Sequence, residues 1–469
     1  MIMKNFSKIV LALSISALAT SCSDWLETTP KASLDAKTAI SNVKDAQVAL
    51  NGVYDAMQTS DYYGRNFLVI PDAAADNLKL SASNSGRFLA HLDWQVIATS
   101  GDNTGVWNAA YNTINRANNI IVNIDAATGA QVEKDQIKGA ALMLRALAHF
   151  DLVRLVAQPY NYTADHSHLG VPYMESPVIG NPVRNTVAEV YSKIERDLTD
   201  AISLMTVQPA NATSVSKWAA KALLSKVYLY EEKWDAAATL AEEIIATSPY
   251  VLATNAEYPT MFTAAAPSKE AIFELMFTAE DNNATNQLGY IYIDSGYGDL
   301  WPTADVIALF SAGDARLGWF YSKSGVIYTQ KFVGRNASKK GQEVNTPILR
   351  LSEVYLIAAE ALAEQPAKEA QALPYLNAIV QRARPTAAAI SLGGDALKDR
   401  IQVERRKELL FEGNRLWDLT RRKLGVVRGA DCTSNTCSVP YPNDKFAYPI
   451  PQRELDANPN MVQNPGYGS

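Results

Sequence analysis

Apolar residues at helical spacing run through most of the chain and limit the folds that are open to it. Within residues 186–205 an apolar side chain recurs at every fourth position, at Val190, Ile194, Leu198 and Ile202. That spacing places all four on one face of a helix. Comparable patterns predict helices around Trp107 and over residues 138–155. The sequence therefore predicts a mostly α-helical body.

Two pairs of segments are typical of helical hairpins. Residues 219–230 and 234–247 form the first pair, and the second of these segments is rich in alanine, which permits close helix contact. Residues 351–364 and 373–384 form the second pair, with Pro374 expected in the first turn of its helix. Both resemble tetratricopeptide hairpins. Because the period between the pairs is not constant, we expect a tetratricopeptide-like scaffold interrupted by insertions.

Two long irregular regions interrupt the helical pattern, about residues 60–104 and about residues 249–346. Regions of this length inside a helical body are usually functional or carry short strands of their own. No segment reads as a linker between domains. We therefore expect one composite domain over residues 22–469.

The N-terminus is typical of an exported protein. Lys4 and Lys8 precede an apolar stretch over residues 9–19, and Ala19-Thr20-Ser21 leads into Cys22. The pattern predicts a signal peptide over residues 1–21. It resembles a bacterial lipoprotein signal, after which Cys22 would carry the lipid anchor, although an ordinary signal peptide that ends near a cysteine is the alternative.

Composition excludes several classes of protein. The chain has 469 residues and a formal net charge of -6, which argues against a protein that binds nucleic acid. Three cysteines exclude a disulfide-dense scaffold, and four histidines leave little room for a metal centre, so we expect no metal and no cofactor. In an oxidising compartment Cys432 and Cys437 are expected to form a disulfide, which we favour over a metal site.

Three C-terminal motifs carry a family resemblance. Residues 347–361 read PILRLSEVYLIAAEA, residues 404–419 read ERRKELLFEGNRLWDL, and residues 448–467 run from YPIP to QNPGY. In this order they resemble the SusD/RagB-like outer-membrane lipoproteins. The resemblance implies a tetratricopeptide-like scaffold and a surface protein without catalytic activity. It also implies a nutrient ligand, usually an oligosaccharide and sometimes a peptide, and a SusC-like TonB-dependent transporter as partner.

Aromatic residues in the two irregular regions are the candidate ligand contacts. Sugar rings have apolar faces and hydroxyl rims, so a binding site needs flat aromatic platforms beside polar groups. We expect Tyr290 and Tyr292 to project from one side of a strand. The proposed contacts from both regions, which we expect to converge on one face, are Asn77, Arg87, Trp94, Tyr290, Tyr292, Tyr297 and Trp301. The alternative is that Trp94 and Trp301 only pack against the scaffold.

Other polar patterns in the sequence could carry chemistry or only structure. Glu404, Glu408 and Glu412 recur every four residues and could be taken for the carboxylates of a surface glycosidase. The arginines among them favour a salt-bridged helix instead, with an Arg415–Asp418 pair and Gly413 as its end. The only histidine cluster, at residues 166–168, is expected in a solvated loop rather than around a metal, and residues 101–105 are expected to form a turn.

Overall fold

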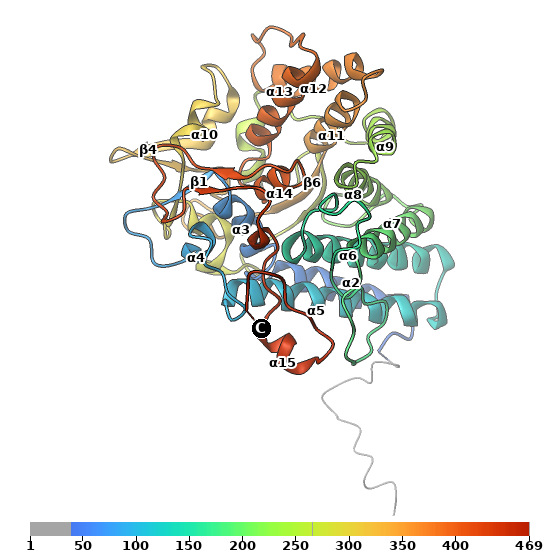
Figure 1. The fold of residues 1–469 in the computed structure, drawn as a ribbon. Coiled ribbons are helices and arrows are strands. Elements are labelled where there is room, and N and C mark those ends of the chain that lie inside the picture. The colour runs from blue at the N-terminus through green and yellow to red at the C-terminus, as the bar shows by residue number, and fades with distance from the viewer. Residues whose placement is uncertain (1–38, 265, 469) are drawn as a thin grey trace, which may run out of the picture.

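The computed structural model describes residues 39–264 and 266–468 (Figure 1). The expected signal peptide over residues 1–21 and the lipid-anchored Cys22 therefore lie outside the described residues.

Long helices pack side by side in chain order. Figure 1 shows them from α2 and α5 at the lower edge to α12 and α13 at the top, with the short strands to one side. Neighbouring helices in the sequence are also neighbours in space, from the α5–α6 and α6–α7 pairs to the α8–α9 and α11–α12 hairpins. The helices are α2 (Val43–Gln58), α5 (Gly101–Asn123), α6 (Gln131–Val156), α7 (Val187–Leu204), α8 (Lys217–Tyr230), α9 (Trp234–Thr247), α11 (Leu351–Ala363), α12 (Glu369–Ala383) and α13 (Gly394–Glu408). The predicted mostly α-helical fold is confirmed.

Local sequence explains where these helices begin and what they bury. Thr186 accepts a hydrogen bond from the Glu189 amide and the Glu189 side chain accepts one from the Thr186 amide, so a capping box starts α7. Along α7 the residues predicted to share one face, including Val190, Ile194 and Leu198, are buried. They belong to a hydrophobic core cluster to which nearly all the long helices contribute.

Two expected boundaries are wrong. Residues 101–105 are not a turn but the first turn of α5, where a glycine costs little and Asp102 lies favourably near the helix N-terminus. Helix α12 begins at Glu369, so Pro374 lies inside the helix rather than in its first turn. Its missing N–H removes one hydrogen bond of that helix.

The irregular regions and the C-terminal part of the chain carry short helices and antiparallel two-stranded sheets. Their short helices are α3 (Asn66–Ala74), α4 (Leu89–Leu92) and α10 (Ala304–Ala308), while α14 (Arg415–Thr420) and α15 (Gln452–Ala457) lie nearer the C-terminus. The strand pairs are β1 (Leu78–Leu80) with β3 (Leu300–Pro302), β2 (Ala271–Leu275) with β6 (Thr346–Arg350), β4 (Phe320–Lys323) with β5 (Val326–Thr329), and β7 (Val426–Val427) with β8 (Ser438–Val439). The β1–β3 pair joins the two irregular regions to each other.

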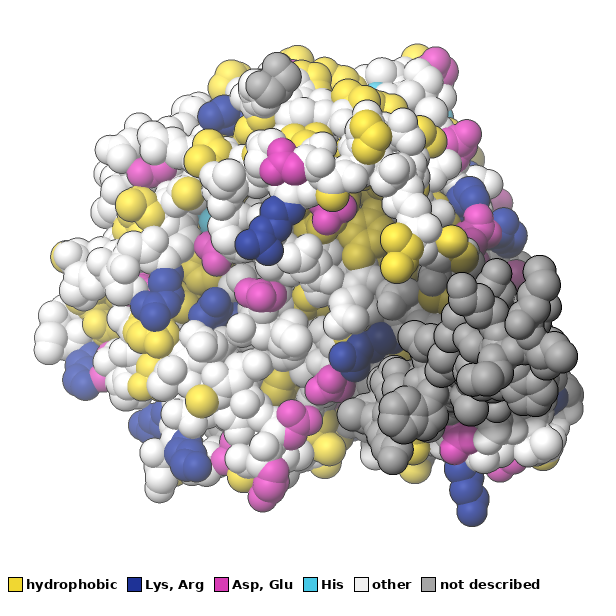
Figure 2. Space-filling model, turned by 90° about the horizontal axis from the view of Figure 1, so that it is seen from below, with side chains coloured by type: hydrophobic (Ala, Val, Ile, Leu, Met, Phe, Trp, Pro, Cys, Tyr) yellow, Lys and Arg dark blue, Asp and Glu magenta, His cyan; other side chains and the backbone are white. Residues whose placement is uncertain are grey.

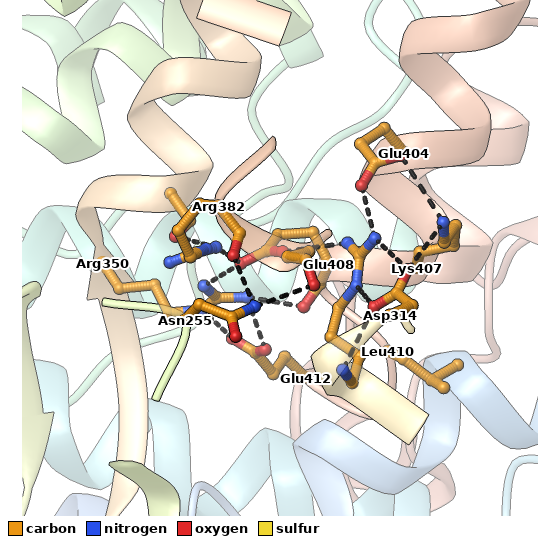
Figure 3. A network of polar contacts seen from close by, with 12 residues as sticks. Asn255, Asp314, Arg350, Arg382, Glu404, Lys407, Glu408, Leu410 and Glu412 are labelled. Atoms are coloured by element: carbon orange, nitrogen blue, oxygen red, sulfur yellow. Dashed lines mark hydrogen bonds and ion pairs between the residues drawn. The ribbon is translucent and has the colours of Figure 1, made fainter. Parts of the chain in front are cut away.

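A buried network of ion pairs connects α12 and α13 to the second irregular region (Figure 3). Arg350, at the end of β6, contacts Glu408 at 2.6 Å and Glu412 at 2.8 Å. Arg382 contacts Glu408 at 2.6 Å, and Arg316 contacts it at 3.1 Å. Burial by itself would raise the pKa of Glu408, but the three arginines hold it well below its ordinary value.

The network confirms the predicted salt bridges and changes their details. Glu404, Glu408 and Glu412 are buried against cations, so they do not face a substrate. Helix α13 ends at Glu408, before Gly413. Gly413 has φ +71°, and a Cβ there would lie 2.9 Å from the Cα of Leu68, so its glycine serves a close approach to α3.

The expected Arg415–Asp418 pair is wrong. Arg415 instead contacts Asp76 at 2.7 Å, and Asp418 contacts Arg405 at 2.8 Å and Arg421 at 3.1 Å. Arg415 and Asp418 are therefore each paired most closely with a residue outside α14 rather than with one another.

The predicted disulfide is present. Cys432 and Cys437 are joined with an S–S distance of 2.17 Å and close the loop between β7 and β8. The loop lies against β1: Asp431 contacts Lys79 at 2.7 Å, and the Leu80 amide donates to the Thr433 hydroxyl at 2.8 Å.

Candidate functional site

The two irregular regions meet where β1 pairs with β3. Lys79 lies opposite Trp301 in this pair. Just beyond it, the Ser81 amide donates to the Asp299 carbonyl at 2.9 Å, and the Ser85 hydroxyl donates to the Asp299 carboxylate at 2.7 Å. The two regions thus converge in space, as the sequence predicted.

Arg87 and two tyrosines form a stack beside this pair. The Arg87 guanidinium carbon lies 3.6 Å from the ring centroid of Tyr297, which is a close cation–π contact. The Tyr297 ring meets the Tyr290 ring edge to face, with centroids 5.0 Å apart at 84°. Asp299 lies 3.7 Å from Arg87 and offsets its charge. Tyr290, Tyr297 and Arg87 are all half-buried, so part of each side chain meets solvent.

The β4–β5 hairpin extends this surface with two more tyrosines. Tyr321 and Tyr328 stack at 5.5 Å and 21°, and Tyr328 meets Trp301 edge to face at 6.0 Å. A Cβ added at Gly298, which follows Tyr297 in the chain, would lie 3.4 Å from the Tyr328 ring, so the two segments are close here. The contacts therefore join half-buried aromatic side chains from three segments. We call this set the aromatic face: Tyr290, Tyr297, Trp301, Tyr321 and Tyr328.

An open groove is lined in part by Trp301. Its empty space is about 760 Å³, open solvent included, and its lining also includes Lys79, Ile307, Val326 and Ile327. Its apolar walls and its one cation suit a ligand with both apolar and polar surface.

Three of the proposed ligand contacts are buried, so the structure does not support their predicted role. They are Asn77, Trp94 and Tyr292. Asn77 is 1% exposed; it donates to Asp72 at 2.6 Å and accepts from Arg406 at 2.8 Å. Trp94 is 6% exposed and packs edge to face on Phe446 at 5.3 Å, which is the packing role given as its alternative.

The expected strand at residues 290–292 is also wrong. Residues Leu288–Ile291 form a 3-10 helix, in which neighbours two apart do not share a face. Tyr290 therefore reaches the aromatic face, whereas Tyr292 turns inward, is 1% exposed and packs on Phe411 at 5.3 Å. Arg87, Tyr290, Tyr297 and Trp301 are the proposed contacts that the structure brings together.

Tyr321, Tyr328 and Lys79 also border this surface, although they are not among the ligand contacts proposed from the sequence. A signal for the tyrosines was available, because Ser324-Gly325 separates two runs of strand-forming residues. Ser324 has φ 51° and Gly325 has φ 79°, the backbone that a two-residue hairpin turn requires. Two strands paired through that turn set Tyr321 opposite Tyr328.

Other kinds of site find little support in residues 39–264 and 266–468. No group of three or more His, Cys, Asp or Glu side chains is placed there to hold a metal ion. His166 stacks on Tyr160 with ring centroids 4.0 Å apart, and His168 bonds to Thr163 at 2.9 Å. Within the same residues, no helix has the length and apolar character needed to cross a membrane.

Comparison with known proteins agrees with this mostly helical architecture. Residues 311–467 match the family described as "SusD family", and residues 24–229 match the one described as "Starch-binding associating with outer membrane". A solved SusD superfamily protein from Bacteroides vulgatus is 31% identical, with a TM-score of 0.85 over 92% of this chain and 100% of its own. The chain belongs to the SusD family.

Two further relatives carry informative descriptions. SusD-like protein P2 of Formosa agariphila is 28% identical over 507 residues, covering 95% of this chain and 97% of its own. A solved SusD-like carbohydrate binding protein from Bacteroides vulgatus is 25% identical, with a TM-score of 0.80 over 90% of this chain and 98% of its own.

Proposed function

We propose that this chain is a cell-surface lipoprotein of the outer membrane that binds a nutrient oligosaccharide and delivers it to a SusC-like TonB-dependent transporter. The observation that carries the proposal is the aromatic face, with half-buried rings from three segments. The carbohydrate-binding description of one relative and the starch-binding, outer-membrane description of the matching family support the ligand class and the location.

The chemistry of the face suits a sugar. The exposed parts of Tyr297 and Trp301 offer flat apolar surface to the C–H face of a ring, while Arg87 and the tyrosine hydroxyls can bond to its hydroxyl rim. The cations of the face already have acidic partners: Arg87 has Asp299, Lys323 has Asp294 and Lys79 has Asp431. This pairing favours a neutral oligosaccharide over an acidic one, because an acidic sugar would need a cation without a partner.

The carboxylates of the face support binding without hydrolysis. A glycosidase needs one carboxyl that is protonated near neutral pH and can donate its proton to the leaving oxygen. Hydrogen bonds from Lys323 and Tyr321 lower the pKa of Asp294 and keep it ionised. Asp299 is buried, accepts a hydrogen bond from the Ser85 hydroxyl and lies 3.7 Å from the Arg87 guanidinium. We therefore propose a protein that holds its ligand unchanged and needs no cofactor.

The anchor completes the proposal. Removal of residues 1–21 would leave Cys22 as the lipid-bearing N-terminus of a single domain over residues 22–469. Two or more acyl chains suffice for stable attachment to a membrane. The only membrane contact that the proposal requires is therefore this lipid.

Binding of the mature protein to a glycan array and to a peptide array tests the ligand class. We expect glycan binding that falls about tenfold or more in Trp301→Ala and Tyr297→Ala, because each loses a stacking surface. The matched control is Tyr162→Ala, which removes an exposed ring away from the face and should leave binding unchanged.

Three results would contradict parts of this proposal. Peptide binding without glycan binding would replace the ligand class. New reducing ends in the bound glycan would make the protein a glycosidase. Unchanged binding in both face variants would place the ligand elsewhere.

A further inference from the structure

The loop that the disulfide closes contacts two walls of the open groove that Trp301 helps to line. It consists of residues 428–437 between β7 and β8, and we call it the disulfide loop. One carboxylate oxygen of Asp431 accepts hydrogen bonds from the Lys79 ammonium at 2.7 Å and from the Ala304 amide at 2.8 Å. Lys79 belongs to β1 and Ala304 begins α10, which Figure 1 shows on the same side of the molecule. Asp431 therefore links two walls of the groove that come from different parts of the chain.

Two further contacts place the disulfide loop against the same walls. The Thr433 hydroxyl accepts from the Leu80 amide at 2.8 Å and donates to the Leu80 carbonyl at 3.2 Å. It thereby pairs with β1 through the backbone groups that an edge strand would otherwise leave open. On α10, a Cβ added at Gly429 would clash with the Asp305 carboxylate, so a glycine permits this close approach.

The disulfide loop is also fixed to the body of the protein beyond these walls. The Asp93 carboxylate accepts from the Ser434 hydroxyl at 2.7 Å and from the Asn435 amide at 2.8 Å. The disulfide restricts the conformations of residues 432–437 between these contacts. Because Asp431 directly precedes this ring, the disulfide also restricts where the Asp431 carboxylate can lie.

The Lys79–Asp431 pair has one side open to a ligand. Both side chains are 24% exposed. Burial by itself would raise the pKa of Asp431, but the hydrogen bonds from Lys79 and from the Ala304 amide hold it below its ordinary value. The pair therefore stays ionised at neutral pH. An ammonium group has three N–H donors, so Lys79 keeps donors for a ligand hydroxyl after one of them has bonded to Asp431.

The groove concentrates its charge at one point. Among the described residues that line it, only Lys79 is charged. Figure 2 shows a different pattern on the underside of the molecule, where acidic and basic side chains are scattered over the described surface. A charge beside apolar walls is screened less than one on an open surface, so the state of Lys79 has a strong influence on which ligands the groove accepts.

We infer that Asp431 is a positioning and specificity-determining residue of the groove: the disulfide loop holds it where it fixes Lys79 and offsets the charge of Lys79. The inference rests on the proposed function, because it takes the oligosaccharide ligand from there. Lys79 then donates to the hydroxyl groups of a neutral sugar. A uronate carboxylate gains little from Lys79, because this cation already has an acidic partner.

Asp431→Asn tests the specificity. The asparagine keeps the shape of the side chain but leaves Lys79 without an acidic partner. On an array of neutral oligosaccharides and uronate-containing oligosaccharides of the same length, we expect the ratio of acidic to neutral binding to rise about fivefold. The matched control is Glu364→Gln, which removes the acid from the Glu364–Lys398 pair, of 2.6 Å and with side chains 23% and 29% exposed. This control should leave the ratio unchanged.

Replacing both cysteines of the disulfide loop by serine tests the positioning role. We expect hydrogen exchange at the Leu80 and Ala304 amides, which donate to the loop, to become about tenfold faster. Binding to the neutral and acidic glycans of the array should fall together, by about fivefold, because the walls of the groove are no longer held in place. The control Thr186→Ala removes the N-terminal cap of α7 and should change neither exchange at these two amides nor glycan binding.

The other outcomes separate this inference from the proposed function. An unchanged ratio of acidic to neutral binding in Asp431→Asn would overturn the specificity role. Wild-type exchange at Leu80 and Ala304 in the double serine variant, or faster exchange without weaker binding, would overturn the positioning role. A wild type that binds no glycan of either kind would refute the proposed function, and faster exchange in the double serine variant would then still show that the loop holds the walls of the groove.

Discussion

Replacing Glu408 by Gln tests whether the buried ion network holds the fold together. Glu408 is fully buried and lies 2.6 Å from Arg350, 2.6 Å from Arg382 and 3.1 Å from Arg316. The glutamine keeps the shape but removes the negative charge that these three guanidinium groups share. Removing one partner of a buried ion pair costs about 3–5 kcal/mol, because the remaining charge stays buried without compensation. We expect a loss of that size in the free energy of unfolding.

Urea unfolding followed by circular dichroism and by tryptophan fluorescence measures this loss. The control is Glu364→Gln, which breaks a surface pair with Lys398 of the same 2.6 Å length. Because that pair is partly exposed, its loss should cost about 0–1 kcal/mol. If Glu408→Gln cost no more than the control, the reasoning that the network is a main source of stability would be refuted.

Three further changes have expected outcomes. Burial raises the pKa of Glu274 to about 7, above its unfolded value, so this group should lower the free energy of unfolding of the wild type as the pH rises from about 4.5 to about 7. Unfolding of wild type and Glu274→Gln at both pH values should show that the variant is spared up to about 3 kcal/mol of this pH-dependent decrease. Replacing both Cys432 and Cys437 by serine opens a ring of six residues and should lower the free energy of unfolding by about 2 kcal/mol, measured by thermal unfolding. An unchanged melting temperature would show that the disulfide does not stabilise the fold. Cys22→Ala should move the protein from the membrane fraction to the soluble fraction, and unchanged fractionation would contradict the lipid anchor.

The helical scaffold was predictable because its signal is local. Apolar spacing alone gave α9 with the bounds that the structure shows, Trp234–Thr247, and it placed α7 within a residue at each end. The strands were not predictable in this way. Each is two to five residues long, too short for alternation between buried and exposed positions to become visible.

The ligand surface was predictable only in part because residue type does not determine burial. Asn77 has the amide group that a sugar site needs, but this amide already hydrogen-bonds to Asp72 and Arg406. Arg406 lies 329 positions away in the sequence, so this contact could not be read from the local sequence. Tyr290 and Tyr292 were expected on one side because residues two apart in a strand share a face. The local 3-10 helix instead points the two side chains in different directions. Tyr297 and Trp301 were placed correctly beside the first region, which β1 and β3 bring together.

A structure of the mature protein with its bound oligosaccharide tests the central claim most directly. The account predicts an intact, uncleaved glycan with a sugar ring within about 4.5 Å of the Tyr297 or Trp301 side chain. A glycan bound away from the aromatic face, or one found cleaved in the complex, would contradict it.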